Sequence, residues 1–125
     1  MIALLLLLQA APPASPPADW STLPPLPVAS AQGAFDPSAY VRREVAAGRC
    51  KATVAAGESR IDAAVAVLVG VGGAIGRIVP QAIACPTVEQ FTVGYVFRLA
   101  RRAVAADPPP RPGWYRHVVT YRWTG

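Results

Sequence analysis

At 125 residues the chain has room for one domain, and two cysteines with a single histidine supply too few ligands for a structural zinc site. The formal net charge is +5, and every lysine and arginine follows Val41, so the basic side chains belong to the part that can fold. This excess favours anionic partners such as nucleic acid, phospholipid or lipopolysaccharide, or else it only solubilises a domain rich in alanine and valine.

The chain opens with an apolar run, Ile2 to Leu8, followed by small residues and prolines. As a helix this run reaches about 12 Å, far less than the roughly 30 Å hydrocarbon core of a bilayer. We therefore predict a secretory signal peptide over residues 1–11, or up to about residue 18, and a periplasmic or secreted protein. No basic residue precedes the leucines and no suitable cleavage motif lies in range. A frayed hydrophobic tail is the alternative.

Residues 12–34 are rich in proline and alanine, and several of the prolines are adjacent to one another. Adjacent prolines favour the extended polyproline conformation and exclude helix. We therefore predict a semi-rigid linker, with a recognition peptide as the alternative, and a folded domain over residues 35–125.

The domain is predicted to begin with a short helix. Asp36 can cap free backbone amides, Pro37 suits a first helical turn, and Gly48 suits the end of the helix. A short strand around Lys51–Val54 is the other element that this region allows.

The clearest local pattern is an alternation of valine with small residues from Val65 to Val71. A period of two predicts a strand that is covered on both faces. Gly72 and Gly73 then allow a tight turn, and Ile75 to Val79 can return as the partner strand until Pro80 ends it. The segment predicts a β-hairpin.

The pattern becomes helical after Cys85. Thr87 and Gln90 have the spacing of a capping box. Apolar residues then form one stripe at helical spacing: Val88, Phe91, Tyr95, Leu99 and Ala103. The polar face of this helix carries Arg98, Arg101 and Arg102, and we expect the helix to end by Asp107.

Trp114 to Trp123 is rich in aromatic and β-branched residues and predicts a last strand. The complete order is a short helix, a hairpin, a long helix and a strand. It predicts an α+β fold, in which one long helix and a short N-terminal helix pack on a three-stranded antiparallel sheet.

The two cysteines, Cys50 and Cys85, do not form a C-x-x-C pair. In an oxidising periplasm we expect them to form a disulfide bond, which a small domain needs more than a large one. Two buried free thiols are the alternative.

This order of elements resembles the C-terminal domain of the energy transducer TonB. Val65–Val71 with Gly73-Ala74-Ile75 looks like the family's hairpin, Cys85 to Glu89 looks like its helix start, and Trp114–Trp123 looks like its closing strand. The family's Tyr-Pro motif is absent, and so is a membrane anchor like the one a working transducer uses. The resemblance thus implies the domain without the motor.

In that family the domain binds a receptor peptide by adding it to the edge of the sheet. If this mode carries over, the peptide-binding edge is the backbone of the last strand: His117, Val118, Val119, Thr120, Tyr121, Arg122 and Trp123. The expected partner is an envelope protein or peptide. The alternatives are an edge protected by its own arginines, or an edge that pairs with a second copy as a homodimer.

We find no catalytic pattern. His117 is the only histidine and sits in a predicted strand, and the acidic residues are scattered. The Gly70–Gly76 stretch lacks the lysine and the following helix of a phosphate-binding loop. We therefore expect a non-enzymatic binding or scaffolding module of the cell envelope, with no cofactor and no bound metal.

The alternative function is polyanion binding through the basic face formed by Arg98, Arg101 and Arg102. Its ligand would be lipopolysaccharide, anionic lipid or nucleic acid. An exported protein rarely meets nucleic acid, so we do not expect that partner.

Overall fold

The structure is a computed structural model that describes residues 14–28, 36–103 and 108–125, without the side chains of residues 102 and 103. The predicted signal peptide falls almost entirely outside these ranges. The elements, in chain order, are η1 (Trp20–Thr22), α1 (Ser38–Ala46), β1 (Thr53–Ala55), β2 (Glu58–Val69), η2 (Val71–Gly73), β3 (Ile75–Pro80), α2 (Pro86–Ala103) and β4 (Gly113–Thr124). The predicted α+β class is confirmed.

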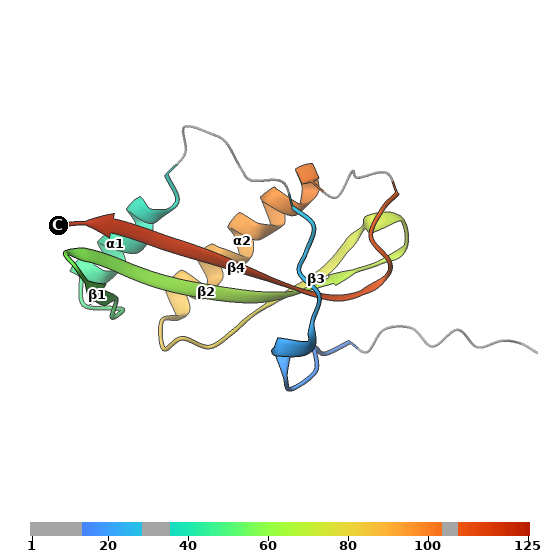
Figure 1. Cartoon of the computed structure of the whole chain (residues 1–125), viewed down its shortest axis with the longest axis horizontal. Helices are drawn as coiled ribbons and strands as arrows, with labels where there is room; N and C mark the ends of the chain where they lie inside the picture. The colour runs from blue at the N-terminus through green and yellow to red at the C-terminus, as the bar shows by residue number, and fades with distance from the viewer. Residues whose placement is uncertain (1–13, 29–35, 104–107) are drawn as a thin grey trace, which may run out of the picture.

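The sheet is antiparallel, and β2 is its central strand (Figure 1). β4 pairs with β2 along its whole length, from Glu58 opposite Thr124 to Val69 opposite Gly113. β1 and β3 pair with opposite ends of the other side of β2. The prediction of three strands is therefore wrong by one, because the sheet has four strands.

The additional strand is β1, which overlaps the short strand that the sequence allows around Lys51–Val54. A two-residue turn at Ala56 and Gly57 pairs it with β2. Their φ angles of 52° and 77° are the positive values that a tight hairpin turn needs. Alanine rarely adopts such an angle, so the sequence gives little sign of this turn. The turn also extends β2 back to Glu58, seven residues before the predicted start of that strand.

The predicted hairpin is present as β2, η2 and β3, although β2 ends at Val69 rather than at Val71. The register shifts between Leu68 and Val69, and Gly72 and Gly73 take positive φ angles of 73° and 82° in the connection. Gly72 and Gly73 therefore form the tight turn predicted from the sequence, because glycine adopts positive φ angles without steric cost.

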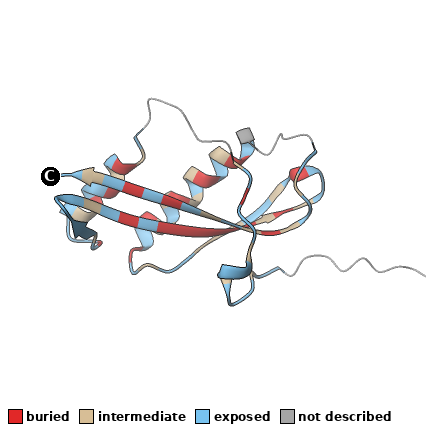
Figure 2. Cartoon of the chain, viewed as in Figure 1, coloured by how far each residue is buried: buried red, intermediate tan, exposed pale blue. Residues whose placement is uncertain are grey.

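Both helices pack on one face of the sheet, and the core lies between the helices and that face (Figures 1 and 2). Alternate β2 residues from Ile61 to Val69 point into this core, as the period of two requires. Cys50 and Cys85 form the predicted disulfide, with 5.3 Å between their Cα atoms, and it ties the start of β1 to the start of α2. Within the described ranges, no helix combines the length and the apolar character needed to cross a bilayer.

The buried stripe of α2 is rotated from the predicted one. It consists of Val88, Thr92, Val96 and Ala100, whereas Phe91, Tyr95 and Leu99 flank it half-buried. Of the predicted stripe, Val88 is buried and Phe91 and Tyr95 pack half-buried against the core, whereas the side chain of Ala103 lies outside the described residues. The centre of the buried stripe is therefore shifted from the predicted one. The physical reason is Thr92, which is fully buried because its hydroxyl donates to the Val88 carbonyl at 2.7 Å.

The helix starts follow the prediction in one case only. Asp36 accepts a hydrogen bond from the Ser38 backbone N–H at 2.9 Å, which is the predicted cap of α1. At α2 the predicted box of Thr87 and Gln90 is wrong. The Glu89 carboxylate accepts the backbone N–H groups of Ile83 and Cys85 instead, and Thr87 donates to Glu44 at 2.9 Å.

Candidate functional site

β4 has β2 on one side, and its other side is an edge of the sheet that the chain's own N-terminal segment touches (Figure 1). Arg116 donates its backbone N–H to the Pro24 carbonyl, and the Leu26 N–H donates to the Arg116 carbonyl, both at 2.8 Å. Pro25 thereby pairs with Arg116 in a parallel bridge. The segment is added to the sheet edge as a very short strand.

This contact anchors a hydrophobic side chain. Leu26 is only 4% exposed and belongs to the main core cluster, whereas Pro24, Pro25 and Pro27 are exposed. The predicted linker thus contributes one buried residue to the fold. The signal that could have found it is a lone leucine among prolines, but composition alone reads that segment as a spacer.

The bridge fixes which backbone groups of β4 face outward. Backbone direction alternates along a strand. Since Arg116 faces the N-terminal segment, Val118, Thr120 and Arg122 face the same way, and His117 and its odd-numbered neighbours face β2. We call the backbone groups of Arg116, Val118, Thr120 and Arg122 the outer edge. Three of its four residues belong to the edge predicted from the sequence, and Arg116 lies just before that edge.

The outer edge is engaged at both of its ends. Arg116 pairs with the N-terminal segment, and the Arg122 N–H donates to the Ser38 hydroxyl at 3.2 Å. Ser38 is buried at the start of α1. Between these contacts lie Val118 and Thr120, for whose outward backbone groups the described part of the chain supplies no partner. The stretch of the edge that has no partner among the described residues is therefore short.

Burial alternates along most of β4 (Figure 2), because successive side chains of a strand point to opposite faces of the sheet. Val119 and Tyr121 are buried on the helix side, where His117 and Trp123 are half-buried. Val118, Thr120 and Arg122 point to the opposite face and are exposed, Val118 by 37%. A peptide added at the outer edge would therefore extend both the covered face and the open face.

Four charged side chains on the open face of β2 and β4 lie in two pairs. Asp62 accepts from Arg60 Nε at 3.1 Å and from the Thr120 hydroxyl at 2.8 Å. These hydrogen bonds, that of Arg60 first, lower the pKa of the Asp62 carboxyl. Arg122 lies 3.9 Å from Glu58. These four side chains carry no net charge together, and the exposed Arg116 adds one positive charge to the same face.

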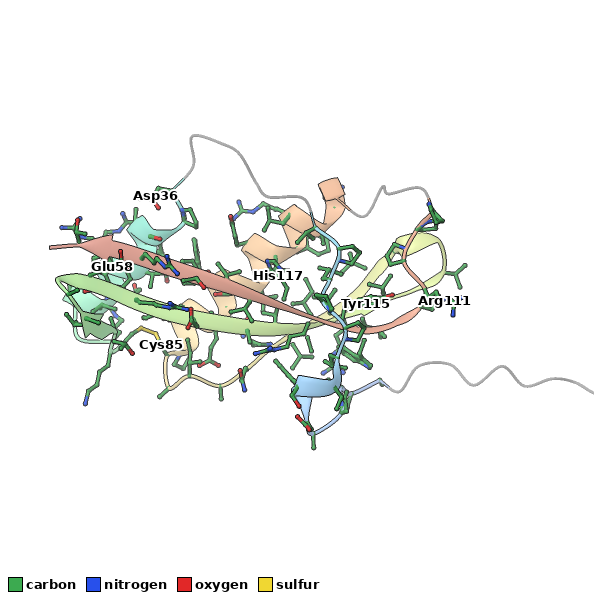
Figure 3. The ribbon with its side chains drawn as sticks, viewed as in Figure 1. Asp36, Glu58, Cys85, Arg111, Tyr115 and His117 are labelled. Carbon is green, nitrogen blue, oxygen red and sulfur yellow. A yellow bond between two sulfur atoms is a disulfide. The ribbon has the colours of Figure 1, made fainter. Side chains whose placement is uncertain are left out.

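His117 lies on β4 beside the point where the N-terminal segment crosses (Figure 3). Burial lowers the pKa of its imidazole, which disfavours the charged form near neutral pH. Among the described residues, no group of three or more His, Cys, Asp or Glu side chains could hold a metal ion.

The basic face of α2 is exposed at Arg98 and Arg101. The guanidinium of Arg101 lies over the ring of Phe97, 5.7 Å from its centroid, and Phe97 is itself 41% exposed. The side chain of Arg102, the third predicted member of this face, lies outside the described residues. The helix thus presents two cations beside an exposed aromatic ring.

Comparison with known proteins gives no assignment. No family model, no curated protein and no solved structure matches this chain.

Proposed function

We propose that this protein is a non-enzymatic binding or scaffolding module of the cell envelope that holds an extended peptide by strand addition at the outer edge of β4. The observation that carries the proposal is the bridge at Arg116, in which an extended segment already uses this edge with two hydrogen bonds of 2.8 Å. A backbone that accepts one extended segment has the chemistry to accept another.

Three further points support the proposal. Val118 and Thr120 continue the same edge, and no described residue bonds to their outward backbone groups. The resemblance of residues 65–123 to the TonB C-terminal domain favours the same binding mode. The Cys50–Cys85 disulfide supports an oxidising compartment, in keeping with the predicted periplasmic or secreted location.

A selection from a library of short linear peptides displayed on phage tests the proposal. Peptides that bind the immobilised, disulfide-intact protein are synthesised, and their affinities are measured by fluorescence anisotropy. The variant Val118→Pro removes an outward N–H without touching β2 pairing, and Val118→Thr is the matched control that keeps it.

Val118→Pro is expected to lower the affinity for selected peptides by about 2- to 13-fold through the lost hydrogen bond alone. Steric hindrance by the proline ring should lower the affinity further. Val118→Thr should leave affinity within about twofold, because a surface substitution on a strand changes little else. Peptides that bind equally well to both variants, or a selection that yields no binder, would refute strand addition at this edge.

A second candidate is binding of a polyanion by α2, which the exposed Phe97 beside Arg98 and Arg101 favours. Affinity for lipopolysaccharide or anionic vesicles should then fall with salt and with Arg98→Gln/Arg101→Gln. It should not fall with the charge-matched Arg42→Gln/Arg43→Gln on α1. Equal losses for the two pairs would show that only net charge matters.

A further inference from the structure

We infer that the outer edge of β4 recognises one class of peptide, an aliphatic residue between two prolines running parallel to β4, and that Pro24–Pro27 is an intramolecular occupant of that site. The inference rests on the proposed function and adds to it the chemistry of the partner.

The hydrogen-bond pattern accounts for the prolines. Only two groups of the segment face β4, namely the Pro24 carbonyl and the Leu26 N–H. The residues on either side of Leu26 are Pro25 and Pro27, which have no N–H to offer. The nitrogens of Pro25 and Pro27 face away from β4, so the missing N–H groups remove no hydrogen bond to the sheet. The two prolines also reduce the conformational freedom lost on binding.

The aliphatic residue provides the anchor. Leu26 is the one hydrophobic side chain of residues 14–28 that is fully buried, and it joins a cluster made mainly of valine. Burying a leucine side chain raises the binding constant of the segment by about 10- to 150-fold. A serine at the same position would contribute almost none of this gain. A peptide with a small polar residue at this position should therefore bind poorly.

Further contacts hold the segment against the sheet. Arg77 on β3 donates to the Ala14 carbonyl at 2.8 Å, and Asp19 caps the turn at η1 by accepting from the Ser21 N–H at 3.0 Å. A shallow pocket between η1, the end of β3 and Arg116 follows this path. The segment thus crosses from β3 to the edge of β4, so a partner of the same class must displace a tethered competitor.

The test uses the full, disulfide-intact chain and a fluorescein-labelled peptide with the sequence of residues 22–28, Thr-Leu-Pro-Pro-Leu-Pro-Val. The variant Leu26→Ser releases the tethered occupant. Leu23→Ser makes the same chemical change three residues earlier, outside the bridge, and is the matched control. If Leu26→Ser does not fold, Leu26→Ala serves in its place.

The peptide should bind Leu26→Ser at least about tenfold more tightly than it binds the wild type or Leu23→Ser. It should also raise the Tm of Leu26→Ser, because a ligand that binds only the native state stabilises it. The same peptide with its second leucine replaced by serine should do neither. Equal binding of the two peptides, or no binding to a folded Leu26→Ser, would overturn the inference.

The two proposals can fail separately. If phage-selected peptides still depend on the Val118 N–H but lack the proline-flanked aliphatic residue, strand addition stands and the partner class is wrong. If selected peptides ignore Val118→Pro, the proposed function fails, whatever the peptide of residues 22–28 does.

Discussion

The buried hydrogen bond between Tyr121 on β4 and Thr92 on α2 can be tested by comparing the stability of two single variants with that of the double variant. Thr92 and Tyr121 are both fully buried, and their hydroxyl oxygens lie 2.7 Å apart. The single proton of the Thr92 hydroxyl is used on the Val88 carbonyl. Tyr121 must therefore be the donor in the bond between them.

Removing the acceptor and removing the donor should have unequal effects on the free energy of unfolding. Thr92→Val leaves a buried tyrosine hydroxyl without a partner, which costs about 1–3 kcal/mol. Tyr121→Phe loses one bond but leaves Thr92 bonded to Val88, and costs about 0.5–1.5 kcal/mol. Adding Tyr121→Phe to Thr92→Val should restore stability, because it removes the unpaired donor.

Urea denaturation of the four proteins, without reductant and at constant m-value, measures this cycle. The expected order of stability places Thr92→Val last, below the double variant. If the double variant is the least stable, with the two losses simply adding, then Tyr121 does not depend on Thr92 and the assignment of the donor is wrong.

Three further predictions concern the disulfide and two titrating groups. Replacing both Cys50 and Cys85 by serine should lower the free energy of unfolding by about 4 kcal/mol, since the bridge spans 35 residues; a loss seen equally on adding reductant to the wild type would confirm the cause. The pKa of His117 is lowered in the fold, so the unfolded chain takes up its proton first and stability should fall as the pH drops below about 6.5; His117→Gln should flatten this slope. Burial raises the pKa of Tyr121 to about 12, so stability should decline as the pH rises from about 10 towards 12, and Tyr121→Phe should remove that decline.

Local patterns predicted most of the secondary structure. The alternation around Val65, the glycine pair at Gly72 and the aromatic strand ending at Trp123 each depend on near neighbours in the chain, and the corresponding β2, β3 and β4 are present. The disulfide followed from cysteine count and the expected compartment. These features need no knowledge of the tertiary structure.

The failures involve residues whose role depends on distant partners. Thr92 is polar and was assigned to no stripe, because its burial requires Val88 and Tyr121 to satisfy its hydroxyl. Leu26 was treated as part of a spacer, because its anchor is formed by a strand that lies ninety residues further along the chain. A short strand near β1 was allowed, but its hairpin with β2 depends on an alanine with positive φ, which no propensity favours.

The outer edge was predicted only as a run of seven residues. The alternation of backbone direction could have been anticipated, but which half faces outward could not, because that depends on the register with β2. The bridge at Arg116 shows which half faces outward, and with the contact of Arg122 it leaves Val118 and Thr120 as the outward residues without a described partner.

Amide hydrogen exchange followed by NMR tests the central claim most directly. In the free protein the Arg116 amide should exchange slowly, because it is bonded to Pro24, and the amides of Val118 and Thr120 should exchange faster. Adding a phage-selected peptide should slow exchange at Val118 and Thr120 and leave Val119, which pairs with β2, unchanged. Binding that protects neither amide and shifts only resonances of α2 would contradict strand addition at β4.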